Sequence, residues 1–161
     1  MNFKCYDVVE IQGKRYVVIE VISYQEFIIE KTVNYTLNDE MYNSELGTHK
    51  GAKNWTEYGL MPVDGEDKKW LTIVNGEKDY CTFSETVLRS TPPKGYKLYD
   101  KGLQRVMSVE GESKARSGDK ADYKEYRSIK KDKTYVFFME DWHGGLKDQA
   151  QGERVRLSDV H

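Results

Sequence analysis

The feature that most constrains the fold is a succession of short runs of β-branched and aromatic residues, each closed by a turn residue within about ten positions. The dipeptides Gln12-Gly13, Asp64-Gly65 and Asn75-Gly76 separate several of these runs. Glycine supplies the positive φ that tight hairpin turns require. The runs predict strands at residues 6–12, 15–22, 27–37, 55–63, 69–74, 79–83, 96–99, 103–110, 123–129, 134–140 and 154–157.

Helical patterns are scarce. Residues 38–46, with Asn38 or Asp39 as a possible N-cap, and residues 84–89 could each form a turn or two of helix. Both segments are short for a helix of a globular protein, which typically has 8–20 residues. The sequence therefore predicts an all-β chain of about ten short antiparallel strands in partly open barrel-like or sandwich-like halves, with at most one or two short helical turns.

The boundary between the halves is expected at the proline pair in residues 91–95, because proline cannot donate to a sheet ladder. This divides the chain into an N-terminal half, residues 1–90, and a C-terminal half, residues 96–161; a single compact domain over residues 1–161 is the alternative. Glu57-Tyr58 and Glu125-Tyr126 each precede the next hydrophobic strand by about a dozen residues. This faint repeat could equally arise from any two hairpins.

Composition excludes several classes of protein. Aromatic residues make up 12% of the 161 residues and the net charge is −2, which argues against a disordered chain. Cys5 and Cys81 are far apart and fit neither a disulfide framework nor a zinc motif. The N-terminus lacks the pattern of a signal peptide and no apolar run approaches a membrane span, so we expect a cytoplasmic protein.

Aromatic side chains are the strongest candidates for a binding surface. Large rings usually fill the core of a small β domain, and that is the simpler interpretation. The functional interpretation is an aromatic groove for a peptide or a single nucleic-acid strand. The candidate groove residues are Trp55, Tyr58, Trp70, Tyr123, Tyr126 and Trp142.

A basic stretch, residues 113–133, carries eight basic and four acidic residues, which leaves −6 for the rest of the chain. Its candidate contacts with phosphate are Lys120, Lys124, Arg127, Lys130 and Lys131. Asp122 and Glu125 interrupt this set and would repel phosphate. A solvated charged face also explains this stretch. The overall charge of the chain argues against a nucleic-acid partner.

Glu140, Asp141, Trp142 and His143 form the densest cluster of groups that could carry chemistry. On a strand, Asp141 and His143 would share one face and Glu140 and Trp142 the other. Two ligands on one face need a third from elsewhere, so Asp141 and His143 are weak metal candidates and a turn between strands accounts for the residues equally. We expect no cofactor and assign no catalytic residue.

Glu57 is the one charged residue singled out inside a predicted strand. Alternation places it on the same face as Trp55 and Gly59 and opposite Thr56 and Tyr58. A buried carboxylate needs a partner, for which Arg15 or Lys69 could serve.

Three segments together resemble a bacterial family of domains of unknown function, number 4178 in its series. They are NWTEYGLMPVDGEDKKWL (54–71), YKLYDKGLQRVMSVEGE (96–112) and MEDWHGGLKDQAQGERV (139–155), in the family's order. The polar stretch 38–53 is longer than the family leads us to expect. The resemblance implies an all-β bacterial module with no activity or catalytic residues to transfer, and gene neighbours that hint at envelope-stress or polyamine-related partners.

The sequence thus favours a non-enzymatic module that binds a protein partner through a strand edge or an aromatic groove. Nucleic-acid binding through residues 113–133 is the first alternative, and a metal-assisted hydrolase centred on Asp141 and His143 is the second. The sequence does not determine the oligomeric state.

Overall fold

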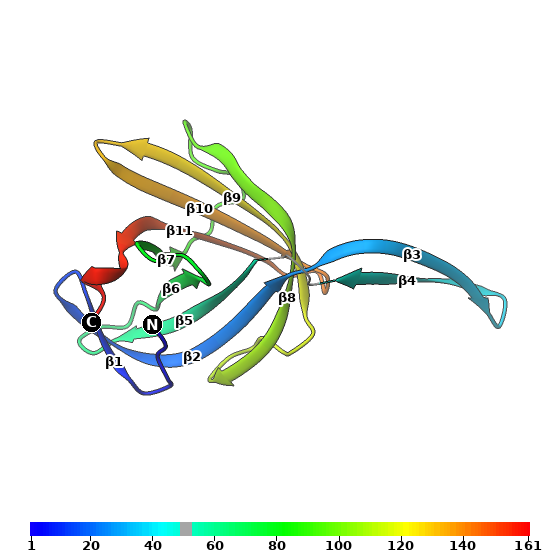
Figure 1. The fold of residues 1–161 in the computed structure, drawn as a ribbon, viewed down its shortest axis with the longest axis horizontal. Coiled ribbons are helices and arrows are strands. Elements are labelled where there is room, and N and C mark those ends of the chain that lie inside the picture. Colours follow the sequence, from blue (N-terminus) through cyan, green and yellow to red (C-terminus); the bar gives the residue numbers. More distant parts are fainter. Residues whose placement is uncertain (49–52) are drawn as a thin grey trace.

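The computed structural model describes residues 1–48 and 53–161, and these form a β protein (Figure 1). A single 3-10 turn, η1 (Leu157–Asp159), follows the last strand, and the described residues contain no helix long and apolar enough to cross a membrane. The strands are β1 (Val8–Ile11), β2 (Lys14–Glu26), β3 (Ile28–Leu37), β4 (Glu40–Thr48), β5 (Asn54–Pro62), β6 (Lys69–Val74), β7 (Tyr80–Thr86), β8 (Lys97–Gly111), β9 (Lys120–Lys130), β10 (Lys133–Trp142) and β11 (Lys147–Arg156).

Eight of these strands close into one antiparallel barrel, in the order β2-β5-β6-β7-β11-β10-β9-β8, with β8 pairing back onto β2. Closure satisfies the backbone groups that an open sheet would leave at its edges. The all-β prediction is confirmed. The strands form one closed barrel rather than two partly open halves, because β2–β8 and β7–β11 pair across the two sides of the chain.

The barrel consists of two four-stranded meanders, β2-β5-β6-β7 and β8-β9-β10-β11, and the segment with Pro92 and Pro93 passes from one to the other. β5 and β9 are the second strands of their meanders. The Glu57-Tyr58 and Glu125-Tyr126 pairs therefore occupy equivalent places in the topology.

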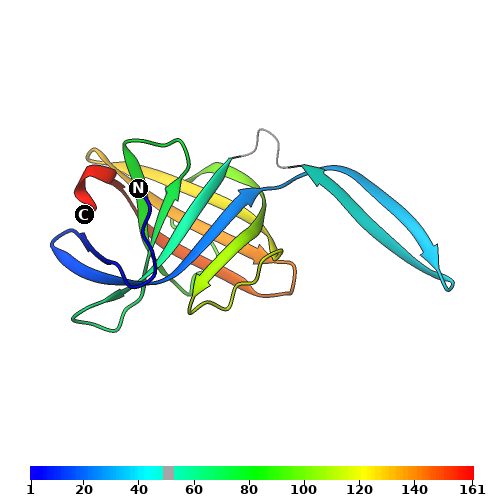
Figure 2. The ribbon, with the colours of Figure 1, turned by 60° about the horizontal axis from the view of Figure 1, so that its bottom comes forward.

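β3 and β4 form a sheet of their own that projects from the barrel as a long arm (Figures 1 and 2). The strand predicted at 27–37 is confirmed, but the helical turn considered at 38–46 is wrong. Asn38 and Asp39 have φ values of 52° and 63° and form the hairpin turn, after which β4 begins. Asn and Asp favour both N-caps and turns with positive φ, so the sequence signal was ambiguous. Part of the polar stretch 38–53, residues 49–52, lies outside the described residues.

Other predicted elements differ at their ends. The helical turn considered at 84–89 is wrong because β7 continues to Thr86, which pairs with Ala150 of β11. The two strands predicted at 96–99 and 103–110 are one 15-residue strand, β8, with an irregularity between Leu98 and Asp100. The strand predicted at 154–157 is the end of the longer β11.

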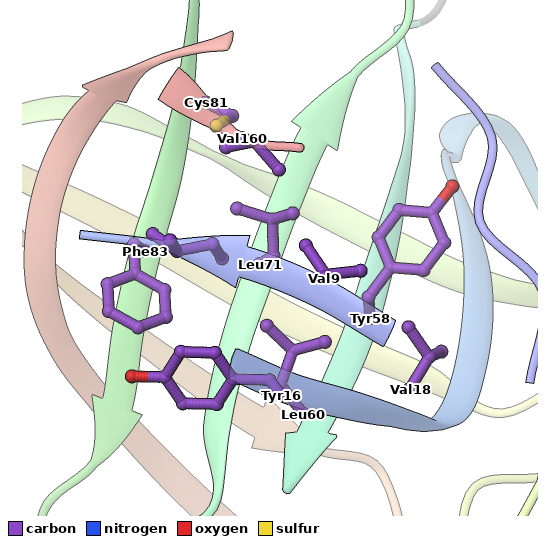
Figure 3. Close-up of a cluster of buried hydrophobic side chains, with 10 residues drawn as sticks. Val9, Tyr16, Val18, Tyr58, Leu60, Leu71, Cys81, Phe83 and Val160 are labelled. Carbon is purple, nitrogen blue, oxygen red and sulfur yellow. The ribbon is translucent and has the colours of Figure 1, made fainter. Parts of the chain in front are cut away.

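A hydrophobic cluster covers the outer face of β5, β6 and β7 (Figure 3). Tyr58, Leu60, Leu71, Cys81 and Phe83 point outward from these strands, since their neighbours in sequence point into the barrel. β1 and the C-terminal segment cover them with Val9, Ile11 and Val160. Ile11 also bridges to Val160. The chain thus places a substantial hydrophobic core outside the barrel wall, where it leaves the interior free.

Candidate functional site

A bulge in β2 decides which of its side chains enter the barrel. Tyr16 and Val18 belong to the outer cluster, whereas Glu20, Ile22 and Tyr24 line the interior. All five have even residue numbers, so strict alternation of side chains along the strand would place them on one face. The register of β2 against β5 shifts between Val18 and Glu20, which turns the second half of the strand inward.

The barrel interior is a cavity of about 920 Å³, to which all eight barrel strands contribute side chains. Eight-stranded barrels are wide enough to hold one small ligand, and this volume lies within the usual range for ligand cavities. The loop between β8 and β9 and the turn between β10 and β11 also line it, at the ends of those strands.

Six aromatic side chains line the cavity: Tyr24, Trp55, Trp70, Tyr123, Phe138 and Trp142. The rings of Tyr24 and Trp55 stack with centroids 5.7 Å apart, and those of Tyr123 and Phe138 stack at 5.9 Å. Trp55 meets Tyr123 edge to face at 5.5 Å, which joins the two stacks. These contacts hold the rings as a continuous apolar wall.

Carboxyl groups from six strands also line the cavity: Glu20, Glu57, Asp100, Glu125, Glu140 and Asp148. Lys68 forms an ion pair with Glu20, and its Nζ lies 4.1 Å from the centroid of the Trp70 ring. The Trp142 Nε1–H donates to Asp148 Oδ2 at 3.1 Å.

Glu140 is held by Gln104, whose Nε2–H donates to Glu140 Oε2. Gln104 is fully buried, and its Oε1 has no hydrogen-bond partner among the described residues. A buried amide oxygen without a partner is costly. This amide lies behind Glu140, which is the member of the pair that lines the cavity.

Burial changes the protonation of these groups. Burial raises the pKa of Glu57 well above its usual range, and the charges of Glu140 and Glu20 raise it further, while Lys68 lowers it. Burial likewise raises the pKa of Glu140 to about 7, opposed by the hydrogen bond from Gln104. Burial and the nearby carboxylates also raise the pKa of Tyr24. Several carboxyls in a poorly hydrated space oppose one another's ionisation.

Four of the six aromatic candidates from the sequence meet in this cavity: Trp55, Trp70, Tyr123 and Trp142. The structure does not bring the other two there. Tyr58 lies in the outer cluster, where Phe3 contacts its ring at 5.4 Å. Tyr126 pairs with Phe137 on the opposite face of β9 and β10 from the cavity, with centroids 6.4 Å apart.

The basic candidates are spread along β9 and the turn that follows it. Lys120 lies at the cavity with its Nζ 4.7 Å from the centroid of the Phe27 ring. Lys130 and Lys131 are exposed beyond the other end of the strand, about 30 Å away for an extended strand of this length. Lys124 is exposed, while Arg127 stacks on Tyr99 and bonds Glu125. The five side chains therefore do not share one surface.

Asp141 lies on the outer face of the barrel, and His143 lies in the turn after β10, which borders the cavity. Asp141 pairs with Asp122 on the outer face of β10 and β9, and the ring of His143 lies 3.4 Å from Asp122 in the following turn. In the part of the chain that the structure describes, no three His, Cys, Asp or Glu side chains are grouped to hold a metal ion. Glu140 and Trp142 share the cavity face, as alternation predicts.

Sequence reasoning missed most polar groups of the site. Glu57 was singled out, but the partners suggested for it are wrong, because Lys69 pairs with Glu85 and the lysine near Glu57 is Lys68. Glu20, Lys68 and Asp148 were not singled out. One signal was present: Glu20 interrupts the apolar run 17–22, which marks it as a charged residue inside a buried strand.

Comparison with known proteins places the chain in a family. No match was found among curated proteins or among solved structures. A family model, described as Domain of unknown function (DUF4178), matches residues 5–157, which includes every strand of the barrel. The chain therefore belongs to the family Domain of unknown function (DUF4178).

Proposed function

We propose that this protein is a binding protein that encloses a small organic molecule in its barrel. The observation that carries the proposal is the cavity of about 920 Å³ with its wall of six aromatic rings. Ligand sites are typically concave and mainly apolar, with a few polar groups that orient the ligand. The outer cluster supplies a core that does not depend on filling the barrel.

This proposal keeps the non-enzymatic binding role favoured by the sequence, but the ligand is a small molecule in the barrel interior in place of a protein partner at a strand edge or an aromatic groove. The cavity offers carboxyls, hydroxyls and aromatic rings, and two of the lysines that line it, Lys68 and Lys53, are bonded to Glu20 and Asp100. Such groups suit recognition of a ligand. The separation of Lys120 from Lys130 weakens the case for a nucleic-acid surface along β9.

A neutral fluorescent probe tests the proposal. N-Phenyl-1-naphthylamine should show enhanced emission with the wild-type protein and saturate at one molecule per chain. Ala150 lines the cavity, so Ala150→Trp should fill it and abolish the enhancement. The control is Lys124→Trp, which adds the same ring at an exposed position. Equal enhancement in the two folded variants would reject the cavity as the binding site.

A second candidate function, binding of a protein partner, is favoured by the arm formed by β3 and β4. The arm extends from the barrel (Figure 2). Its side chains Tyr35, Leu37 and Met41 are exposed. A two-stranded sheet with apolar exposed residues can add a strand from another chain. A photo-crosslinking residue at position 41, introduced in the native cell, should give one discrete adduct, whereas the same residue at the barrel position 63 should not. Identical adducts from both positions, or none, would reject this role.

A further inference from the structure

The charges inside the cavity are unbalanced. Among the carboxyls that the barrel strands place there, Glu20 pairs with Lys68, Asp100 with Lys53 and Glu125 with Arg127, which leaves Glu57, Glu140 and Asp148. Among the described residues, no Lys, Arg or His lies within ion-pair distance of the other three carboxyls. The interior therefore has an excess of acidic groups over basic ones.

The other lysines that border the cavity do not correct this imbalance. Lys53 pairs with Asp100, Lys114 is exposed in the loop between β8 and β9, and the ammonium of Lys120 lies over the ring of Phe27. Burying a carboxylate without a counter-charge is costly, so such groups either take up a proton or pair with a cation. Burial raises the pKa of both Glu57 and Glu140, as expected for buried carboxyls that have no ion-pair partner among the described side chains.

Lys68 shows how this cavity receives an ammonium group. Its Nζ is bonded to the carboxylate of Glu20 and lies 4.1 Å from the centroid of the Trp70 ring. A carboxylate combined with the face of an aromatic ring is the combination that attracts organic cations by charge and by cation–π interaction.

Elsewhere in the cavity, carboxyls again lie among aromatic rings. There, no cationic side chain of the described residues forms an ion pair with Glu57, Glu140 or Asp148. Trp142 bonds Asp148, and its ring lies 6.5 Å from that of Tyr24, which stacks on Trp55. Glu57, Glu140 and Asp148 line the same cavity as these rings. The fully buried Gln104 donates to Glu140 and holds that carboxyl in the cavity wall.

We propose that the ligand of the barrel is an organic cation, whose ammonium group binds among Glu57, Glu140 and Asp148 against the rings of Tyr24, Trp55 and Trp142. This inference rests on the proposed function and adds the charge class of the ligand. The apolar body of the ligand lies along the aromatic wall. The carboxyls provide selectivity, because they attract an ammonium and repel an anion of the same shape.

Three water-soluble probes with one aromatic body and different charges test the inference: 2-phenylethylamine, 2-phenylethanol and 3-phenylpropanoate. Isothermal titration calorimetry at pH 8 should show the amine binding at least tenfold more tightly than the alcohol and the acid not binding. Glu57→Gln combined with Asp148→Asn should reduce the advantage of the amine over the alcohol to less than threefold. Glu110→Gln, which removes an exposed carboxyl, should leave it unchanged.

The outcomes separate this inference from the proposed function. Equal affinities for the amine and the alcohol would overturn the cation inference while leaving binding in the cavity intact. Preserved preference for the amine in the double variant would also overturn it. Thermal unfolding of the variants shows whether they are folded, and if the double variant is not, Asp148→Asn alone should still lower the preference. Failure of all three probes together with failure of N-phenyl-1-naphthylamine would overturn both proposals.

Discussion

Gly59 and Glu20 lie directly opposite each other on β5 and β2, and a Cβ atom at position 59 would overlap the side chain of Glu20. Gly59 pairs with Glu20 immediately after the bulge that turns β2 inward. The glycine thus provides the space in which Glu20 enters the barrel and reaches Lys68. Because Gly59 has no side chain, the charged side chain of Glu20 on the neighbouring strand fits beside it.

Gly59→Ala should therefore displace Glu20 and break its ion pair with Lys68. We expect a loss of about 1–3 kcal/mol in the free energy of unfolding, the usual cost of overpacking. Denaturant titration measures it. Gly144→Ala is the matched control, because a Cβ there meets no atom within 4 Å. Equal stabilities of the two variants would contradict this role of Gly59.

Gly152 lies in the seam between the two meanders, where β11 pairs with β7. It lies opposite Ser84, and a Cβ at position 152 would overlap the carbonyl oxygen of Phe83. Backbone cannot move aside as a flexible side chain can, so Gly152→Ala should be more destabilising than Gly59→Ala. Amide hydrogen exchange should show reduced protection of β7 and β11 in this variant. Unchanged protection of both strands would show that the seam accommodates the methyl group.

Stability should depend on the protonation of Glu140. Burial raises the pKa of Glu140 from the ordinary 4.5 of a glutamate to about 7, while the hydrogen bond from Gln104 opposes this and Asp148 adds to it. The native state therefore binds more protons than the unfolded state between these values, and stability falls as pH rises through this window.

Glu140→Gln removes this dependence. We expect the variant to be more stable than the wild type at pH 8, by up to about 3 kcal/mol, and to differ much less at pH 5. The other titratable groups around Glu140 are Glu57, Asp148, Tyr24 and Tyr123, so some pH dependence remains. Urea unfolding at the two pH values measures the effect. A constant difference between the variant and the wild type would refute it.

Trp70 and Leu71 are neighbours on β6 that point to opposite sides of the barrel wall. Leu71 is fully buried in the outer cluster, whereas Trp70 borders the cavity and donates to Thr86 Oγ1 at 3.1 Å. Leu71→Ala should cost about 2–5 kcal/mol by leaving a void in a close-packed cluster. Trp70→Ala should cost less, because the ring already borders an open space. The opposite ranking in denaturant titration would show that the barrel interior is the main core.

The arm should be dispensable for folding of the barrel. β3 and β4 form a separate sheet, and the Glu26 N–H donates to the Lys53 carbonyl at 2.9 Å where the arm leaves the barrel. A variant with residues 28–52 replaced by Asn-Gly should keep its melting temperature within a few degrees and bind N-phenyl-1-naphthylamine as the wild type does. Loss of folding in this variant would place the arm within the cooperative unit.

The sequence by itself determined the local structure of this protein. Runs of β-branched and aromatic residues between Gln12-Gly13 and Asn75-Gly76 predicted the strands from 15 to 74 apart from β4, because alternation and turn chemistry are properties of neighbouring residues. The same alternation correctly assigned Trp55 and Glu57 to one face and Glu140 and Trp142 to one face. The three family-like segments identified the family.

Only the tertiary structure decided where those faces point. After Val18 a bulge changes which residues of β2 face the barrel interior. No dipeptide in the sequence marks this bulge, so alternation alone could not predict that Glu20 faces the interior. Tyr58 and Trp55 have similar sequence signals, yet β1 covers one and the cavity receives the other. Barrel closure brings carboxyls from β2, β5, β10 and β11 into one space, and contacts between strands this distant along the chain depend on the register of every strand between them.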